Sequence, residues 1–595
     1  MLLFFSALIR LFLAAYIELG NDEVYYINYA LYPDLSHFDH PPMVGWFIQL
    51  FSLNLLFESE AFIRLGAVVA GTINTWLIYL IGKQLKDELT GWYAALLYTS
   101  SIYCFIIAGT FMMPDAPQTL FWLGSIYLMI RLVKAGPDSK TAGKFMLLAG
   151  ITAGLALLSK YTSVFLFSGL GLYFLLFDRK WLKKWQVYAA ILISLVFFLP
   201  VIIWNIRYDF ISFTFHTERV EVVQTLLRPD LFAIELGGQI FYNNPFVFAL
   251  VIAGLIAFRK GNFAANKPEI RLLLTTALPV IVLFLGFSLF RRTLPHWTGP
   301  AYMTLIPLAA IYLRQLTEKG RQNYLFPQVI TWALGFLALI ITVALLQFSQ
   351  GWFLNKGINP ETGKRLGIKD ITLDMYGWEQ LHYGFKSVYE QDTASGRMSK
   401  DAVIIQQRWF PAANLDYYVA RPLGIKLLTL ADIERTHKYA WITQSRGGFH
   451  LGMDAYYFSS SYDFSDPNGQ YTDYFTTIEA PDTIPVYRNG LLVEYQYVWR
   501  MKGMKMIADF GLKFGNSFSP CLLFPLSPAP IKLIILHNPL YHLRGIHPFI
   551  KLLTGEQPKS YSCFTERRAF RVGFFGNFSC IFIANMGIER CNQHQ

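Results

Sequence analysis

Two pairs of potentially reactive residues stand near the start of the chain. Asp22 and Glu23 are adjacent, Asp39 and His40 follow, and the stretch from Gly20 to Ile48 that holds both pairs contains no lysine or arginine. A carboxylate within about 3 Å of a hydroxyl group can take its proton while the oxygen forms a new bond. The first pair therefore suits a general base for group transfer. The alternative is that Asp22 caps the helix that follows it.

The second pair lies directly before two prolines, Pro41 and Pro42. Consecutive prolines end a helix and hold the chain in an extended turn. An acid and a histidine fixed in such a turn could bind a divalent metal ion, with Asp39 as the candidate ligand, or a phosphate, with His40 as the ligand. A purely structural histidine is the alternative.

Two isolated charges stand in later apolar stretches. Asp115 lies in the break 113–117, and Lys160, followed by Tyr161, separates two apolar segments. An unpaired charge at membrane depth is costly, so such residues are usually functional or paired. We expect Asp115 to contact substrate unless it caps the next helix. We expect Lys160, with Tyr161 beside it, to meet either a lipid phosphate or Asp115.

Three arginines and one further histidine are candidate ligands for an anion. Arg64 begins an apolar segment, and Arg291, Arg292 and His296 share one short loop next to Trp297. A guanidinium group binds phosphate through two parallel hydrogen bonds. We expect these residues to contact a phosphate or, in the case of Arg64, a phosphate or a carboxylate, with phospholipid headgroups as the alternative partner.

Aromatic residues are abundant, at 17% of the chain. Tyrosine and tryptophan suit both interfacial belts and sugar-facing surfaces. Tyr25 and Tyr26, which follow the first acidic pair, are therefore candidate sugar-binding residues, with a place in an interfacial belt as the alternative.

The composition is that of a membrane protein. Of 595 residues, 54% are hydrophobic and 15% are charged, and the mean hydropathy is +0.35. Soluble domains carry roughly 25% charged residues. Basic residues of membrane proteins collect in cytoplasmic loops, so the net charge of +11 does not indicate nucleic-acid binding.

Long apolar runs recur through residues 1–348, which we interpret as a transmembrane catalytic domain. A spanning helix needs roughly 17–25 apolar residues, and shorter ones can span inside a bundle. We predict about eleven transmembrane helices from these runs. They lie near residues 2–19, 61–82, 92–109, 117–133, 145–159, 161–177, 187–205, 236–258, 272–290, 301–313 and 326–348.

The distribution of lysine and arginine sets the orientation of these helices. The loops 83–91, 134–144, 178–186, 259–271 and 314–325 hold 16 of these residues, whereas the alternate loops hold 6. Loops rich in lysine and arginine stay in the cytoplasm. Asp22, Asp115 and His296 are then expected on the same, extracytoplasmic side.

The hydropathy falls after residue 348. Residues 349–505 alternate polar and apolar positions, with strand-like pieces at 402–405 and 486–488 and a turn signal at 488–490. Such a pattern predicts a small α/β domain, which the orientation places outside the membrane. Residues 506–595 hold four of the five cysteines and show no helical or strand periodicity. We interpret them as an anomalous tail, which is frameshifted, unrelated to the rest or disordered, with a genuine extra module as the alternative.

Four motifs that occur in order resemble the bacterial branch of the GT-C glycosyltransferases. This branch is similar to the dolichyl-phosphate-mannose–protein mannosyltransferases and the lipid A aminoarabinose transferases. The resemblance covers residues 1–348 closely, continues less specifically to about residue 505, and does not cover 506–595. The motifs are NDEVYYINYALYPDLSHFDHPPMVGWFIQLF, MMPDAPQTLFW, LALLSKYTSVFLF and RRTLPHWTGPAYMTLIPLAA.

The resemblance implies a polytopic α-helical membrane enzyme. Such an enzyme moves a sugar from a polyprenyl-phosphate carrier to a lipid, glycan or protein acceptor on the outer face of the cytoplasmic membrane. By resemblance, Asp22 is the catalytic base, with Glu23 beside it. Where the aminoarabinose transferases carry Glu-Lys, this chain has Asp39-His40, a departure that bears on both metal and phosphate binding.

The expected reaction is a direct displacement that inverts the anomeric centre. The carrier phosphate is expected at Lys160, at Arg291 or Arg292, and at His40. The alternative function is a polytopic lipid or solute transporter, or a flippase. Transporters commonly show inverted repeats with interrupted helices in both halves, and the sequence contains no internal repeat.

Overall fold

The computed structural model describes residues 1–220, 226–261, 263, 267–320, 325–352, 366–368 and 370–506. All of these belong to one compact unit, Met1–Phe518. The tail predicted at 506–595 lies outside the described residues except for Met506, as does most of the segment 353–369.

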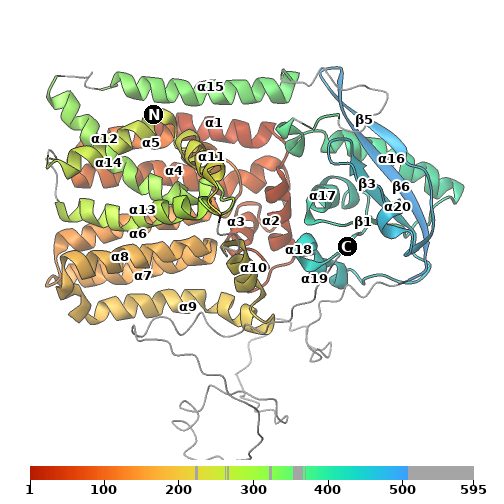
Figure 1. The fold of residues 1–595 in the computed structure, drawn as a ribbon, viewed down its shortest axis with the longest axis horizontal. Coiled ribbons are helices and arrows are strands. Elements are labelled where there is room, and N and C mark those ends of the chain that lie inside the picture. Colours follow the sequence, from red (N-terminus) through yellow and green to blue (C-terminus); the bar gives the residue numbers. More distant parts are fainter. Residues whose placement is uncertain are drawn as a thin grey trace, which may run out of the picture. The chain divides into compact units, whose positions relative to one another are not determined.

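The chain up to Gln350 is helical (Figure 1). Helices α9 and α15 expose many large apolar side chains, such as Leu192, Val196 and Leu339, as expected for surfaces that face lipid. The helices are α1 Leu2–Tyr16, α2 Asn21–Leu31, α3 Met43–Phe51, α4 Glu60–Leu85, α5 Glu88–Ser100, α6 Asp115–Ala135, α7 Lys140–Ser159, α8 Val164–Phe177, α9 Trp185–Arg207, α10 Ile211–Val220, α11 Pro229–Tyr242, α12 Pro245–Arg259, α13 Lys267–Ser288, α14 Gly299–Glu318 and α15 Gln328–Gln350.

Five helices of the described residues are long and apolar enough to cross a membrane, namely α4, α7, α9, α13 and α15. The number rises to 7 if each of two bent pairs, α1–α2 and α11–α12, counts as one span. The predicted break at Lys160 is confirmed, because α7 ends at Ser159 and the short 3-10 helix η2, Tyr161–Ser163, leads into α8. The total of eleven spans stays a prediction.

The single helix predicted at 236–258 is wrong. The structure has α11 and α12 there, bent by 100° at their junction. Pro245 opens α12, and Asn244 before it has φ +66°, a conformation that cannot continue a helix. The Asn244 side chain fixes the bend by donating to the carbonyls of Ser100 at 2.9 Å and Ala333 at 2.8 Å.

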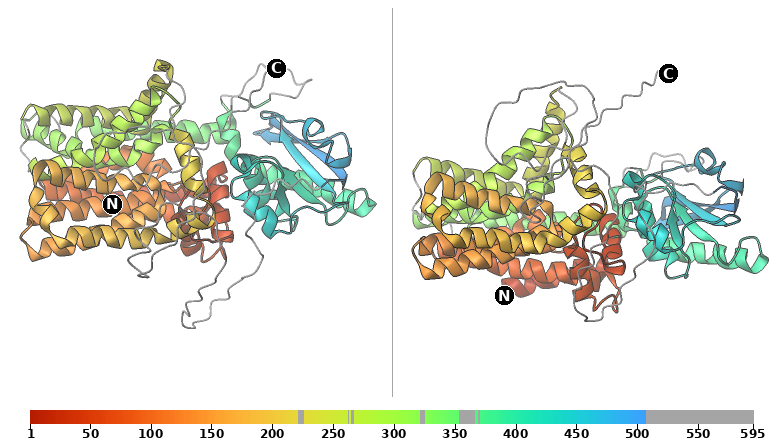
Figure 2. Two further views of the ribbon diagram at one scale, coloured as in Figure 1. Left: turned by 60° about the horizontal axis from the view of Figure 1, so that its bottom comes forward. Right: turned by 90° about the horizontal axis from the view of Figure 1, so that it is seen from below.

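The sheet domain follows the helices and extends from Ile371 to Met504 (Figures 1 and 2). Its six strands form a mixed sheet in the order β2-β1-β3-β6-β4, with β5 also paired to β6. Strand β1 runs parallel to β2 and β3, and β6 runs antiparallel to β3, β4 and β5. The strands are β1 Val403–Gln406, β2 Leu427–Thr429, β3 Ala455–Ser460, β4 Phe475–Ile478, β5 Asp482–Arg488 and β6 Leu491–Met504; the helices are α16 Trp378–Ser395, α17 Trp409–Asn414, α18 Ile433–Thr436, α19 Tyr439–Ser445 and α20 Asn468–Tyr471.

The strands predicted at 402–405 and 486–488 are confirmed as β1 and β5. The turn signal between β5 and β6 is confirmed too, since Asn489 and Gly490 have φ of +48° and +75°. Two residues with positive φ form the tight turn that suits the twist of a hairpin. Short-range sequence signals were sufficient here because the turn chemistry is local.

The sheet domain contacts the helices around α2 (Figure 2). The Leu19 amide donates to the Tyr418 hydroxyl at 2.7 Å, Arg421 pairs with Glu58 at 2.6 Å, and the Trp378 amide donates to Glu18 at 3.0 Å. These contacts join the sheet domain to the segments directly before α2 and α4.

The backbone of α2 lies close to α3 at Gly45. A Cβ atom at Gly45 would lie 2.7 Å from the Cβ and 2.8 Å from the carbonyl carbon of Tyr29. Gly45 is therefore required for the close approach of α2 and α3. Helix α2 contains Asp22 and Glu23, and α3 follows the loop with Asp39 and His40.

We expect Gly45→Ala to lower the thermal unfolding midpoint by several degrees, since overpacking a tight contact costs about 1–3 kcal/mol. The control is Gly171→Ala in α8, where an added Cβ would meet nothing within 4 Å. Thermal unfolding of the purified proteins in one detergent measures both. Equal midpoints for the two variants would contradict a tight α2–α3 contact.

Candidate active site

Glu23 lies in a buried ion pair with Arg64. The guanidinium group donates to Glu23 through Nε at 2.8 Å and through a terminal nitrogen at 2.6 Å. Glu23 also accepts the backbone N–H groups of Met112 at 2.9 Å and Gly20 at 3.0 Å. With four hydrogen bonds and 2% exposure, the carboxylate of Glu23 is held in place by the fold.

The remaining N–H groups of Arg64 are also used. They donate to the carbonyls of Ala14 at 3.0 Å, Ile17 and Glu18 at 3.0 Å, near the carboxyl end of α1. Of the partners expected for Arg64, the structure contains a carboxylate, that of Glu23; the catalytic role of Glu23 stays a prediction. Both side chains are fully hydrogen-bonded within the protein, so together they hold α1, α2 and α4 in place at the site.

A second cluster surrounds Asp39. The hydroxyl groups of Tyr25, at 2.9 Å, and of Tyr29 both donate to its Oδ1, and the backbone carbonyl of Asp39 lies 2.7 Å from Nε2 of His216. Burial opposes ionisation of Asp39, but its charged and hydrogen-bonding neighbours outweigh burial and lower the pKa of this carboxyl group. Asp39 is therefore a buried carboxyl group that two tyrosine hydroxyls hold in place.

A third cluster joins Asp115 and Lys160. The ammonium group of Lys160 lies 2.7 Å from Oδ2 of Asp115, and the Tyr103 hydroxyl donates to Oδ1 at 2.8 Å. Both charged side chains are buried, with 7% exposure for Lys160 and 1% for Asp115. Asp115 begins α6 and Lys160 follows α7, so the pair forms only when the two helices pack. Of the two partners expected for Lys160, the structure contains Asp115.

His40 connects the second and third clusters. Burial lowers the pKa of His40 to about 3, and charges on Asp39, Lys160 and Asp115 act on its ring. His40 is thus uncharged at neutral pH, and its expected role as a phosphate ligand stays a prediction. Its Nδ1 atom is buried and has no hydrogen bond to the described residues, so a neutral imidazole nitrogen remains available for a ligand.

Asp22 and Tyr26 lie close to His40 and the two acidic clusters that it connects. Tyr26 packs edge-on against His40, with 5.8 Å between ring centroids, and the charges of Asp22, Asp39 and Asp115 all act on its hydroxyl group. Asp22 is partly buried in the first turn of α2. The candidate residues of three separate sequence motifs therefore converge on Tyr26 and His40.

The other predicted residues differ in how far the structure connects them to this centre. His296 lies near enough to Lys160 and Asp115 for their charges to act on it. Tyr161 packs edge-on against His216 at 5.1 Å. Arg291 is partly buried and Arg292 exposed in the loop after α13, and their contact with a phosphate stays a prediction.

The sequence model of a family described as dolichyl-phosphate-mannose-protein mannosyltransferase matches residues 39–204. Two crystal structures of ArnT from Cupriavidus metallidurans, one apo and one bound to undecaprenyl phosphate, match with TM-scores of 0.52 and 0.53. Each match covers 84% of this chain and 97% of ArnT, at 14% and 16% identity.

The chain has the GT-C fold of ArnT. This finding confirms the resemblance inferred from the sequence. Among curated sequences, the lipid A galacturonosyltransferase RgtD of Rhizobium johnstonii is 24% identical over 51% of this chain and 65% of RgtD. The undecaprenyl phosphate-alpha-4-amino-4-deoxy-L-arabinose arabinosyl transferase of Pseudomonas paraeruginosa is 27% identical over 48% of this chain and 51% of that protein. The chain thus matches about half to two thirds of the length of these relatives.

The residues of this chain do not fit the metal site that was expected at Asp39. One carboxylate oxygen of Asp39 already accepts two tyrosine hydroxyls. The described residues contain no group of three or more His, Cys, Asp and Glu side chains that could hold a metal ion. A divalent ion needs several such oxygen or nitrogen ligands, so no step below is assigned to one.

Sequence reasoning missed several residues of the site. Tyr29, Tyr103 and His216 contact Asp39 or Asp115, and His37 and Lys438 lie beside them. Tyr29 follows Tyr25 by four positions and so shares its face of α2. This spacing could have identified Tyr29 from the sequence. Nothing local marks His216 or Lys438, which reach the site only through packing.

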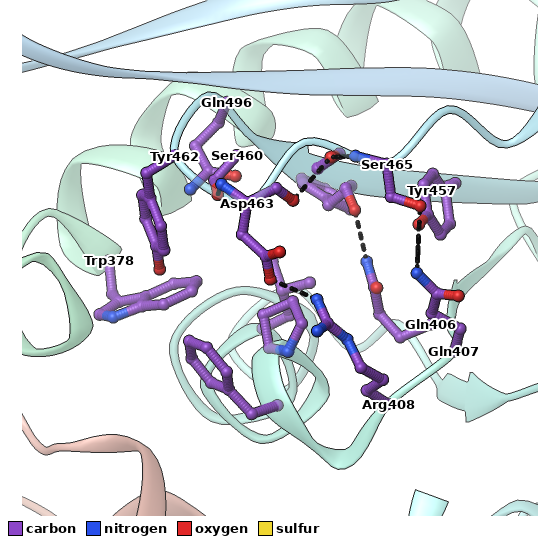
Figure 3. Close-up of a pocket in the computed structure, with 15 residues that line it drawn as sticks. Trp378, Gln406, Gln407, Arg408, Tyr457, Ser460, Tyr462, Asp463, Ser465 and Gln496 are labelled. Carbon is purple, nitrogen blue, oxygen red and sulfur yellow. Dashed lines mark hydrogen bonds and ion pairs between the residues drawn. The ribbon is translucent and has the colours of Figure 1, made fainter. Parts of the chain in front are cut away.

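A small pocket in the sheet domain is separate from these residues (Figure 3). Arg408 and Asp463 form an ion pair between its walls, and Gln407 bonds Ser465 at 3.1 Å. The cavity measures about 20 Å³, and a single water needs roughly 10–15 Å³. It is too small for a sugar, so we assign it no substrate.

We expect Glu23→Gln to destabilise the protein by about 3–5 kcal/mol, because it leaves the buried charge of Arg64 uncompensated. The control is Glu88→Gln, which breaks an exposed pair with Lys83 and should hardly change stability, because solvent screens such pairs. Chemical or thermal unfolding in detergent measures the difference. If Glu23→Gln is as stable as Glu88→Gln, the pair does not hold the fold.

The acid stability of the protein should depend on His296. Burial, together with the charge of Lys160, lowers the pKa of His296 from 6.5 to about 4. Between these values the unfolded chain binds more protons than the folded one, so stability falls as the pH drops from 6.5 towards 4.

We expect His296→Gln to reduce the fall in unfolding midpoint between pH 7 and pH 5, measured in matched buffers. His450→Gln is the control because His450 is exposed. An unchanged pH dependence in His296→Gln would mean that His296 is not held in its neutral form.

Proposed function

We propose that the protein is an integral membrane glycosyltransferase that uses a polyprenyl-phosphate-linked sugar as donor. The observation that carries this proposal is the convergence of Asp22, Asp39 and Asp115 with Lys160 and His40 at one buried centre. A carboxylate base next to a cation and a neutral imidazole suits displacement of a phosphate leaving group. The GT-C fold, shared with an ArnT structure that holds undecaprenyl phosphate, supports the same assignment.

The carrier phosphate is proposed to bind at Lys160 and His40. An ammonium group has three N–H donors, and one of them is directed at Asp115. The other two can meet phosphate oxygens, and the buried Nδ1 of His40 can add a neutral hydrogen bond. Arg291 or Arg292 would contribute further positive charge. Asp115 keeps Lys160 charged and fixes its position.

Asp22 is proposed as the base. An oxygen of the acceptor attacks the anomeric carbon while the bond from that carbon to the phosphate oxygen breaks. The acceptor proton passes to Asp22, polyprenyl phosphate leaves, and the anomeric centre is inverted. Phosphate leaves readily, so stabilising its charge matters more than protonating it. Tyr25 and Tyr26 line the sugar side of this centre.

The proposed topology places this centre on the outer face of the inner membrane. The lysine and arginine counts of the loops support that orientation. We retain about eleven spans, with shorter helices crossing inside the bundle. We also retain a catalytic part at residues 1–348 and an extracytoplasmic α/β domain at 349–505 that covers the acceptor side. The acceptor is a lipid, glycan or protein.

We expect Asp22→Asn to fold and to bind the carrier lipid, yet to lose transfer by at least about 100-fold, because general-base catalysis contributes roughly 10²–10⁴-fold. Purified protein incubated with a panel of polyprenyl-phosphate sugars and membrane lipid, with release of polyprenyl phosphate as the readout, measures this loss.

The matched control is Asp138→Asn, whose carboxylate is 83% exposed in a predicted cytoplasmic loop and pairs with Lys184. Asp138→Asn should retain full activity. Undiminished transfer by Asp22→Asn would remove Asp22 from the mechanism, and no release by wild type from any donor would reject the proposed function.

A further inference from the structure

A cavity of about 360 Å³ lies next to the proposed reaction centre and takes no part in the mechanism above. Pockets for small molecules measure roughly 300–1,000 Å³, so this volume suits one compact ligand group. The cavity is formed by the loop after α2, the end of α9, and α19 of the sheet domain. Its lining residues are Leu31, Tyr32, Pro33, Asp34, Ser36, His37, Phe38, Trp204, Lys438, Trp441, Ile442 and Ser445.

Aromatic rings form part of the wall of this cavity. The rings of Trp204 and Trp441 lie 5.9 Å apart at an angle of 47°, and Phe38 lies 6.2 Å from Trp441. These residues come from α9, α19 and the loop after α2, so the wall exists only in the folded protein. Flat apolar surfaces of this kind stack against the C–H faces of sugar rings.

Two charged groups lie among these rings. Asp34 accepts the indole N–H of Trp204 at 2.8 Å. Lys438, which is 7% exposed, donates to the carbonyl of Tyr32 at 2.7 Å and contacts Nδ1 of His37. Burial lowers the pKa of Lys438 to about 7. A carboxylate and a third ammonium N–H are thus available for ligand hydroxyl groups.

Only one layer of side chains separates this cavity from Asp39. The backbone N–H of Lys438 lies 3.3 Å from the Tyr25 hydroxyl, and its ammonium nitrogen lies 5.3 Å from the centre of the Tyr29 ring. Both tyrosines donate to Asp39. A ligand in the cavity would therefore lie directly behind the residues that line the reaction centre.

We propose that this cavity binds a pyranose ring of the acceptor. The combination of aromatic walls, a carboxylate and an amino group matches a ring with apolar faces and hydroxyl edges, whereas a lipid chain would make no hydrogen bond to either polar group. The donor phosphate is assigned to Lys160 and His40, and α19 belongs to the domain proposed to cover the acceptor side. The assignment of the ring to the acceptor rests on the proposed function.

Binding can be tested without activity. Saturation-transfer NMR on the detergent-solubilised full chain would use methyl α-mannopyranoside, methyl β-glucopyranoside and methyl α-galactopyranosiduronate as probes. We expect a signal for at least one glycoside with wild type, and a loss of at least about fivefold in Trp441→Ala, the size of effect that one aromatic contact supplies. Trp185→Ala, at the exposed start of α9 (65% exposed), should leave the signal unchanged.

Asp34→Asn keeps an acceptor for the Trp204 indole N–H but removes the negative charge. It is the variant to test if Trp441→Ala does not fold. It should also weaken the signal. No signal for any of the three glycosides with wild type, or equal signals in wild type, Trp441→Ala and Asp34→Asn, would overturn the proposal.

Kinetics separate this inference from the proposed function. With a working donor and acceptor, Trp441→Ala should raise the KM for the acceptor about tenfold while the KM for the donor stays unchanged. An unchanged acceptor KM would reject the cavity as the acceptor site while the glycosyltransferase assignment stands. If glycoside binding depends on Trp441 but the protein releases no polyprenyl phosphate, the proposed glycosyltransferase function is rejected. The cavity would then stand as a carbohydrate-binding site alone.

Discussion

The buried pair of Glu23 and Arg64 holds together the part of the protein on which the candidate site depends. Arg64 lies in α4, yet it bonds carbonyls at and just after the carboxyl end of α1 and the carboxylate of Glu23 in the first turn of α2. Cations favour the carboxyl end of a helix and anions the amino end, so one guanidinium and one carboxylate satisfy both helix termini at the bend. Through the Met112 amide, Glu23 also ties in the loop that leads to Asp115.

This arrangement explains why neighbouring acids have different roles. Residues 22 and 23 differ by about 100° around the helix axis. The Glu23 carboxylate faces Arg64 and is paired with it. Asp22 lies on the same side of α2 as Tyr26, where the charges of Asp22, Asp39 and Asp115 all act on the Tyr26 hydroxyl group. A buried charge costs several kcal/mol unless it is paired. The pairing of Glu23 with Arg64, and of Asp115 with Lys160, lets the protein hold many charges in a largely apolar interior.

The sheet domain completes the site from the other side of α2. Lys438 reaches back from the start of α19 to Tyr25, His37 and the carbonyl of Tyr32. The loop between α2 and α3 is therefore held between a helical layer with the phosphate-binding candidates and a domain with an aromatic cavity. Such a division suits a reaction between a membrane-bound donor and an acceptor that approaches from another direction.

The sequence by itself determined the membrane character, the strands β1 and β5 with their turn, and the motifs that contain Asp22, Asp39, Asp115 and Lys160. These features depend on composition, local turn chemistry and isolated charges in apolar runs, all of which can be read within a few residues. It also predicted that Lys160 could meet Asp115, since two opposite charges in apolar surroundings favour each other.

Only the tertiary structure decided which of these residues pair with one another. In the folded protein Glu23 pairs with Arg64, and the helix predicted at 236–258 is bent. His216 and Lys438 contact the loop after α2. These outcomes depend on pairs far apart in the chain, such as Lys438 with Tyr25. Hydrophobic periodicity specifies which face of a helix is buried but not which distant side chain will meet it there.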